Sequence, residues 1–306
     1  MLEPASKSRG NGKAPAAVGH SRERLDRVLA DLVVNGSIEL SFGGAAAIDS
    51  VSRVLPYGMA VYLPQPPQRS FEENLAQLRN VHAAGFDPVP HLCARQVSSA
   101  GALREFLQAA VGEAGVHRVM LVGGDHPGPQ GPYADSTALL ASGILVECGI
   151  REVDVAGYPE GHHHIPAAGL IADLRARWEM AEEQGLGLSL VTQFSFLPSR
   201  IVEYCDELAH DLPRLPIYVG LAGPGKADAL LHFARVCGVS ESLRALSSLG
   251  VQAARLACHT SPDEQLEVLA RYCAGHESSN VIGIHVFSFG GFSNAANWMR
   301  EKFPHA

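Results

Sequence analysis

The chain of 306 residues is poor in lysine, with only four lysines among 24 basic residues. None of them lies in a segment that we expect to form a strand. A Schiff-base aldolase needs a lysine at a strand end, so this enzyme class is disfavoured. The basic residues form no run and the net charge is −8, so the sequence has no electrostatic footprint for nucleic acid or an anionic membrane.

Paired cysteines and long apolar runs are also absent. The six cysteines form no C-x-x-C pair, which favours free thiols and a cytoplasmic protein. No apolar run approaches the ~18 residues of a membrane helix, so we expect a soluble protein. Residues 1–20 lack the apolar stretch of a signal peptide and are expected to be a disordered tail. Residues 21–306 are then one catalytic domain.

Eight short apolar segments alternate with segments of helical periodicity. Repeated strand–helix units predict a parallel sheet. The count of eight favours a closed (β/α)8 barrel, with an open doubly wound sheet as the alternative. The expected strands are 37–41, 58–63, 89–92, 118–122, 153–157, 188–192, 217–220 and 282–287.

Two additions to the simple barrel are expected. A helix capped by Ser21 precedes the first strand and ends at Asn35-Gly36. Extra helices lie between the last two strands, near 227–237, 241–256 and 262–274. Capping boxes are expected at Ser70, with Glu73, and at Ser261, with Glu264, and one helix is expected near 134–147.

Reactive side chains follow several of the expected strands. Barrels of this kind build their reaction site at the carboxyl ends of the strands. Glu39 lies in an apolar segment, where a carboxyl is costly to bury, and no arginine lies in a neighbouring strand, so we expect a functional role. Asp125, in the turn Gly124-Asp125-His126-Pro127, fits either the site or a helix cap. The other candidates are His91, Tyr158, His162 and Gln193.

A metal site is the alternative for some of these side chains. His91, Asp125 and His162 together would suit a divalent ion in a metal-dependent hydrolase. The consecutive residues His162, His163 and His164 cannot all point the same way, and outside them no H-x-H or H-E-x-x-H spacing is present.

Five of these motifs occur together in the order found in one enzyme family. Over about residues 37–300 the chain resembles the methylenetetrahydrofolate reductases. The matching segments are Glu39, Pro90-His91-Leu92, Gly124-Asp125-His126-Pro127, Tyr158-Pro159-Glu160-Gly161-His162 and Thr192-Gln193-Phe194.

The resemblance implies a (β/α)8 barrel that interconverts 5,10-methylenetetrahydrofolate and 5-methyltetrahydrofolate. Glu39 would be the general acid that opens the five-membered ring, which requires a raised pKa. Asp125 would stabilise the iminium cation that forms, with its carboxylate ionised. The Gln193 amide, with one acceptor and two donors, would suit the edge of the pterin.

The chain departs from the family where FAD is held. Gly123 replaces an arginine, the helix after the fifth strand has no lysine, and Tyr62-Leu63-Pro64-Gln65-Pro66 replaces a Thr-Tyr-Gly-Ala type segment. FAD is the family default, and Arg95 or Arg175 would have to replace the missing cations. We therefore expect hydride to pass directly between NAD(P)H and the folate.

In that interpretation, His91, Tyr158 and His162 form the pocket for the nicotinamide. A folate-binding barrel without catalysis is a third interpretation, although binding alone has less need of Glu39. The sequence leaves open the choice of NADH or NADPH, the direction of reaction and the oligomeric state, a homo-oligomer included.

Overall fold

The computed structural model describes residues 16–40, 45–66, 69–124, 126–162, 165–225, 227–239 and 261–304. Several of the features discussed above lie outside these residues. They are residues 1–15 of the expected tail, Asp125, the two histidines His163 and His164, and the helix expected near 241–256.

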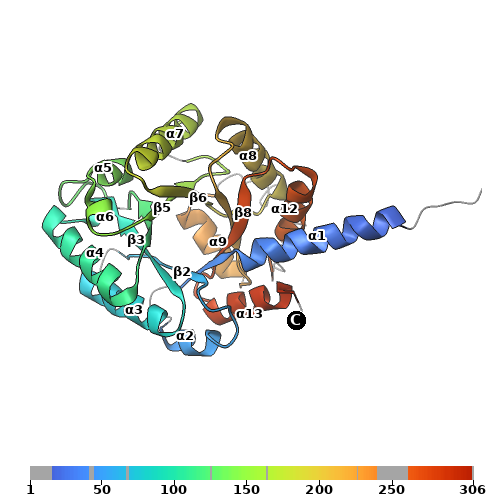
Figure 1. Ribbon diagram of the computed structural model, residues 1–306, viewed down its shortest axis with the longest axis horizontal. Coiled ribbons are helices and arrows are strands. Elements are labelled where there is room, and N and C mark those ends of the chain that lie inside the picture. Colours follow the sequence, from blue (N-terminus) through green and yellow to red (C-terminus); the bar gives the residue numbers. More distant parts are fainter. Residues whose placement is uncertain are drawn as a thin grey trace, which may run out of the picture.

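Eight parallel strands close into a barrel in sequence order, with β8 paired to β1 (Figure 1). This confirms the predicted (β/α)8 architecture. The strands are β1 (Ser37–Glu39), β2 (Ala60–Leu63), β3 (Asp87–Cys93), β4 (Arg118–Val122), β5 (Glu152–Gly157), β6 (Gly187–Thr192), β7 (Ile217–Ala222) and β8 (Val281–Phe287).

Helices surround the barrel, and helix α1 extends well beyond it at its N-terminal end (Figure 1). Helix α1 precedes β1, and both α9 and α12 lie between β7 and β8, so these expected additions are confirmed. The helices are α1 (Ala16–Val34), α2 (Ala45–Val51), α3 (Phe71–Ala83), the 3-10 turn η1 (Ala94–Gln96), α4 (Ala100–Ala114), α5 (Ser136–Ala141), α6 (Ile144–Glu147), α7 (Ala167–Glu183), α8 (Pro198–Asp211), α9 (Ala227–Val236), α12 (Asp263–Gly275) and α13 (Phe292–Lys302).

Three predicted helix boundaries are wrong. Helix α1 begins at Ala16, so Ser21 lies inside the helix and does not cap it. The helix expected near 134–147 is two short helices, separated where Gly143 adopts a positive φ of 73°. At α12 no side chain caps the helix, because the Ser261 hydroxyl donates to the Asp263 carboxylate instead.

The capping box at Ser70 is confirmed. The Ser70 hydroxyl accepts a hydrogen bond from the Glu73 backbone N–H at 3.2 Å, and the Glu73 carboxylate accepts from the Ser70 N–H at 3.0 Å. Two N–H groups that would otherwise lack partners at the start of α3 are thus satisfied.

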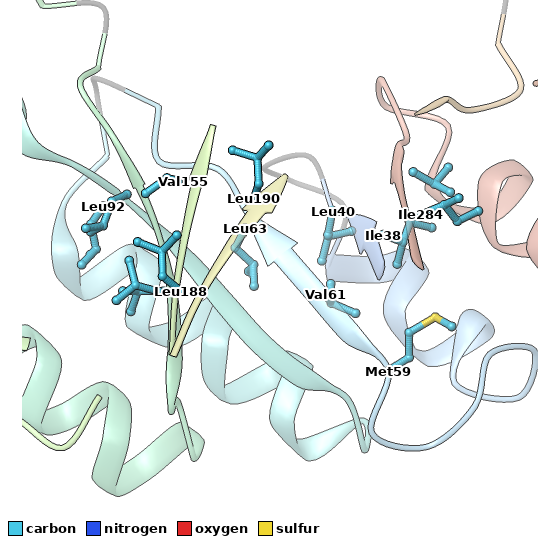
Figure 2. Packing of buried hydrophobic residues seen from close by; sticks show 14 of the residues in the cluster. Ile38, Leu40, Met59, Val61, Leu63, Leu92, Val155, Leu188, Leu190 and Ile284 are labelled. Carbon is cyan, nitrogen blue, oxygen red and sulfur yellow. The ribbon is translucent and has the colours of Figure 1, made fainter. Parts of the chain in front are cut away.

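The main apolar core lies between the strands and the helices that surround them. Buried side chains of β1, β2, β6 and β8 point out of the barrel wall toward the helices, among them Ile38, Val61, Leu190 and Ile284 (Figure 2). Successive residues of a strand point to opposite sides. The residues between these positions, Ser37 and Glu39 of β1 among them, therefore face the barrel interior.

Five of the cysteines lie in the described part of the chain, and all five are free thiols. Over the same residues, none of the helices combines the length and the apolar character that crossing a membrane requires.

Candidate functional site

Glu39 is the last residue of β1, at the end of the barrel where these sites are built. It is half-buried, its neighbours Ile38 and Leu40 are fully buried, and it lies opposite Tyr62 in the β1–β2 register. Burial raises the pKa of the Glu39 carboxyl from 4.5 to about 7. Near neutral pH, Glu39 can therefore hold a proton and donate it.

Two neutral imidazoles lie in the barrel interior, on β3 and β8. Burial lowers the pKa of His91 to about 4, and burial together with the nearby His91 lowers that of His285 to about 3. The Tyr62 ring meets both in edge-on contacts, with centroid distances of 4.6 Å to His285 and 6.1 Å to His91. His91 was expected from the sequence, whereas His285 was not.

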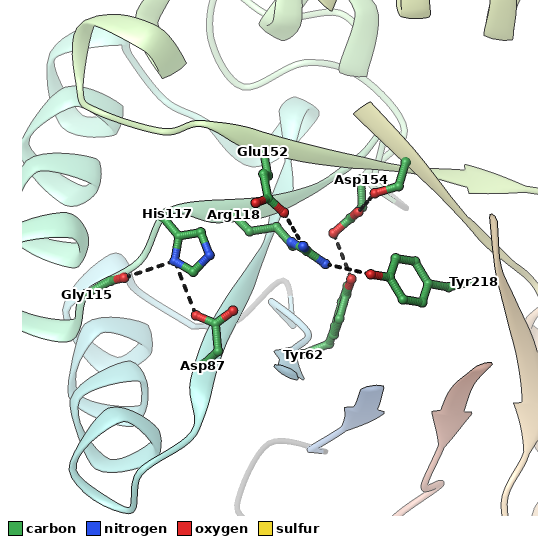
Figure 3. A network of polar contacts seen from close by, with 9 residues as sticks. Tyr62, Asp87, Gly115, His117, Arg118, Glu152, Asp154 and Tyr218 are labelled. Carbon is green, nitrogen blue, oxygen red and sulfur yellow. Dashed lines mark hydrogen bonds and ion pairs between the residues drawn. The ribbon is translucent and has the colours of Figure 1, made fainter. Parts of the chain in front are cut away.

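Tyr62 also belongs to a buried polar network within the barrel (Figure 3). Its hydroxyl donates to Asp154 Oδ2 at 2.7 Å, and the Ser189 hydroxyl donates to Asp154 Oδ1 at the same distance. Arg118 reaches across the interior from β4, donates to the Tyr218 hydroxyl at 3.4 Å and pairs with Glu152.

The network around Asp154 was also not predicted, although the sequence contains a signal for it. Asp154 lies between Val153 and Val155 on β5, and His285 between Ile284 and Val286 on β8. A polar residue between two apolar neighbours of a barrel strand points inward when those neighbours point outward. The same reasoning that selected Glu39 therefore applies to Asp154 and His285.

Tyr158 and His162 follow β5 and lie together, as predicted. Their rings meet with a centroid distance of 4.7 Å and an interplanar angle of 62°. The Tyr158 backbone N–H donates to the Tyr204 hydroxyl of α8 at 3.4 Å, and burial raises the pKa of Tyr158. His91 does not share this ring contact; it comes from β3 and lies against Tyr62 instead.

Gln193 follows β6 and joins the ends of two strands. Its backbone N–H donates to the Gly157 carbonyl at 2.7 Å, and its side-chain Oε1 accepts from the Phe194 N–H at 3.1 Å. One of the two lone pairs of Oε1 is therefore used, and the other lone pair and the Nε2 donors remain for a ligand.

The turn after β4 is held by Arg95 of η1. The Arg95 guanidinium donates to the carbonyls of Ala134 at 3.1 Å and Gly124 at 3.3 Å. His126 is hydrogen-bonded within its own turn, to Gly128. The predicted position of Asp125 itself falls outside the described residues.

Arg95 and Arg175, the two arginines that would have to replace the FAD-binding cations, are both hydrogen-bonded to backbone carbonyls. Arg175 donates to the carbonyl of Asp211, the last residue of α8. Helices of the barrel run opposite to the strands, so this bond lies at the far end of the barrel from Glu39. Arg95 is bonded to the carbonyls of Ala134 and Gly124. At Gly123, where the resembling family has an arginine, an added methyl group would meet no atom within 4 Å.

An aromatic cluster covers the ends of β6 and β8. Phe194 lies edge-on to Phe287 and Phe289, and Phe289 stacks on Phe233 of α9 with centroids 4.6 Å apart. Phe289 has a positive φ of 46°, which is strained for a bulky side chain. These rings were not predicted from the sequence as part of a site.

The metal-site alternative finds no support in the described residues. Within them, no three His, Cys, Asp or Glu side chains lie close enough together to hold an ion. The set of His91, Asp125 and His162 cannot be judged as a whole, because Asp125 is not among them.

No protein-family model matches the chain. The chain is similar in fold to a Burkholderia cenocepacia protein assigned as a phosphonomutase, at 12% identity and a TM-score of 0.49 over 89% of this chain and 94% of that one. It is also similar to dihydropteroate synthase from Thermus thermophilus, at 14% identity and a TM-score of 0.44 over 87% and 92%. At these identities the likeness concerns the fold alone.

Proposed function

We propose that this protein is an oxidoreductase of the methylenetetrahydrofolate reductase type, which interconverts 5,10-methylenetetrahydrofolate and 5-methyltetrahydrofolate with a nicotinamide dinucleotide. The observation that supports it most is Glu39. It is a carboxyl at the mouth of the barrel whose pKa is raised to about 7 by burial. General acids work best when their pKa lies near the working pH.

The reduction needs one proton and one hydride. Glu39 donates the proton to the bridging nitrogen as the bond from that nitrogen to the methylene carbon breaks. The methylene carbon stays on the other nitrogen as an iminium cation. The nicotinamide, when bound, supplies the hydride that converts this cation to the methyl group. The sum is one folate, one NAD(P)H and one proton giving methyltetrahydrofolate and NAD(P)⁺.

The neutral state of the two imidazoles suits this chemistry. A protonated histidine beside Glu39 would lower the pKa of the carboxyl and repel the developing iminium cation. Because the pKa values of His91 and His285 are lowered to about 4 and about 3, neither carries that charge near neutral pH. The ionised Asp125 carboxylate remains our candidate for stabilising the cation.

Candidate binding groups for the folate lie at or after the ends of β6 and β8. The Nε2 donors of Gln193 would pair with acceptors on the pterin. The half-buried rings of Phe287 and Phe289, stacked with centroids 6.0 Å apart, offer an aromatic surface at the same end of the barrel. Flat aromatic ligands stack favourably on such surfaces.

The residues present do not fit FAD as the family holds it. The pyrophosphate of FAD requires cations that neutralise it, and Arg95 is engaged by two carbonyls while Arg175 lies at the other end of the barrel. A flavin therefore has no part in the reaction that we propose. Tyr158 and His162, with His91, remain our candidates for the nicotinamide pocket.

The test is an anaerobic assay of purified protein with 5,10-methylenetetrahydrofolate and NADH or NADPH, with and without added FAD. We expect nicotinamide oxidation coupled to formation of methyltetrahydrofolate, and a protein that purifies without flavin absorbance. Glu39→Gln should still bind methyltetrahydrofolate but lose turnover by about a hundredfold or more, the usual size of a general-acid contribution. Exposed Glu105→Gln on α4 is the matched control.

Two results would refute the proposal. One is a protein that shows no turnover under any of these conditions, and the other is a Glu39→Gln variant that turns over at the normal rate. Activity that depends on added FAD would leave the reductase assignment intact but overturn its flavin-independent form. Activity on another substrate that EDTA abolishes would support the hydrolase instead.

A further inference from the structure

The barrel interior beneath Glu39 is more polar than packing requires. Four side chains that face inward from four different strands are at most 8% exposed: Tyr62, Asp154, Ser189 and His285. Barrels of this kind usually fill this space with branched apolar side chains. A buried carboxylate costs several kcal/mol unless its environment compensates it, so the arrangement calls for a reason.

Burial raises the pKa of Asp154, and three groups oppose that rise. The Arg118 guanidinium from β4 favours the charged form, and Tyr62 and Ser189 each donate a hydrogen bond of 2.7 Å to one of its oxygens. The proton of the Tyr62 hydroxyl is therefore used in the hydrogen bond to Asp154. The ring of Tyr62 is fixed at its hydroxyl end by a bond that comes from the opposite side of the barrel (Figure 3).

The other part of the Tyr62 ring meets the two imidazoles. His285 lies edge-on to it, with an interplanar angle of 67°, and His91 at 83°. The Nδ1 atom of His285 also shares a hydrogen bond of 2.9 Å with the Ser37 hydroxyl. Ser37 lies two residues before Glu39 on the same interior face, and Tyr62 is the strand partner of Glu39.

We propose that Tyr62 is a positioning residue for the reaction proposed above. Its ring, clamped through the hydroxyl by Asp154, holds the His285 and His91 imidazoles in place and forms the floor beneath Glu39. The inference rests on the proposed function for its kinetic readout. The geometry is independent of that function.

The hydrogen bond between Tyr62 and Asp154 affects Glu39 by fixing the positions of the rings beneath it. A ring held at its far end cannot tilt, so the imidazoles that lean on it cannot turn toward the Glu39 carboxyl and pair with it. The groups that face Tyr62 are Asp154 from β5, Arg118 from β4, His91 from β3 and His285 from β8. A loosened floor would misalign the acid, and small misplacements of reacting groups cost up to a hundredfold in rate.

The experiment compares Tyr62→Phe and Asp154→Asn with Glu152→Gln. The first variant keeps the ring and removes its hydroxyl, and with it the bond to Asp154 and the interaction with Arg118. The control removes a carboxylate from the same arginine, Arg118, without touching Tyr62. We measure kcat and KM against pH, and the imidazole nitrogen signals of His91 and His285 by NMR on the full-length protein.

For Tyr62→Phe we expect kcat to fall about ten- to a hundredfold with KM changed less than about threefold, and the pH profile of kcat to move. The His285 imidazole signals should shift in Tyr62→Phe and in Asp154→Asn. Glu152→Gln should keep kcat within about twofold and leave those signals in place.

The proposal is overturned if folded Tyr62→Phe keeps both kcat and the imidazole signals, or if Glu152→Gln loses as much as Tyr62→Phe. If Asp154→Asn does not fold, the Tyr62→Phe comparison still decides. If the wild-type protein has no reductase activity, the proposed function fails while the NMR signals still report on the clamp. Unchanged signals with normal turnover would refute the clamp and leave the function standing.

Discussion

Replacing Glu39 with glutamine should stabilise the protein at alkaline pH. The pKa of the carboxyl is 4.5 in its ordinary state and about 7 in the folded protein, a difference of about 2.5 units. Each unit corresponds to about 1.36 kcal/mol, so ionised Glu39 opposes folding by up to about 3.4 kcal/mol. Functional carboxyls held in unfavourable surroundings commonly carry such a cost.

The sign and the pH range follow from the direction of the shift. Because the folded pKa is raised, the folded state binds the proton more tightly than the unfolded state. Below pH 4.5 the penalty is absent, and it grows as the pH rises until it is complete above about 7. The two-state expression gives a penalty of about 1.4 kcal/mol at about pH 5.5 and about 3.4 kcal/mol at about pH 8.5. Glutamine carries no charge, so Glu39→Gln escapes this penalty.

The assay is the free energy of unfolding in urea at the two pH values. We expect Glu39→Gln to gain about 2 kcal/mol more, relative to the wild type, at about pH 8.5 than at about pH 5.5. Exposed Glu105→Gln should show no such difference between the two pH values. Equal effects of Glu39→Gln at both pH values, or a loss of stability at the higher one, would refute the raised pKa.

Further predictions concern packing and capping. Gly220→Ala should cost more than about 3 kcal/mol or prevent folding, because the added carbon would lie 2.0 Å from the Thr192 carbonyl oxygen. In Gly112→Ala of α4 the added carbon meets no atom within 4 Å, so this variant should be more stable by about 0.5 to 1 kcal/mol, and urea unfolding measures both effects. Ser288 is 2% exposed and its hydroxyl has no partner in the described chain, so Ser288→Ala should be neutral or stabilise by about 1 kcal/mol, and a loss above that would reveal a missed hydrogen bond. Ser70→Ala should cost about 1 kcal/mol in thermal unfolding, and an unchanged Tm would show that the cap contributes nothing.

The barrel itself could be predicted because its signal is repeated. Each of the eight apolar segments is bounded by turn residues, and an error of one or two residues in any strand does not change the count. Helix ends were less predictable. Ser261 has the spacing of a cap, yet its hydroxyl bonds to the Asp263 carboxylate, a local competition that spacing alone does not resolve.

Most of the candidate side chains were chosen because they follow a strand, as Tyr158 and Gln193 do. Glu39 was chosen because a carboxyl is conspicuous within an apolar segment. Asp154 and His285 lie in the middle of apolar strands and meet only after the barrel closes. Their partnership with Tyr62 depends on the register of strands far apart in sequence, which periodicity does not give.

The cation replacements show the same limit. Arg175 and Arg95 are both arginines near the expected site in the sequence. One lies on the outer helix with its guanidinium at the opposite end of the barrel, and the other holds the turn after β4. Sequence distance says little about which end of a helix a long side chain reaches.

The central claim is that hydride passes directly between a nicotinamide and the folate at a site served by Glu39. The most direct measurement uses NADH or NADPH deuterated at the transferring position, with 5,10-methylenetetrahydrofolate and flavin-free protein under anaerobic conditions. The account predicts one deuterium retained in the methyl group of the product, formed at a rate that Glu39→Gln lowers by about a hundredfold or more. No methyltetrahydrofolate, or product that forms only with FAD and has lost the deuterium to water, would contradict it.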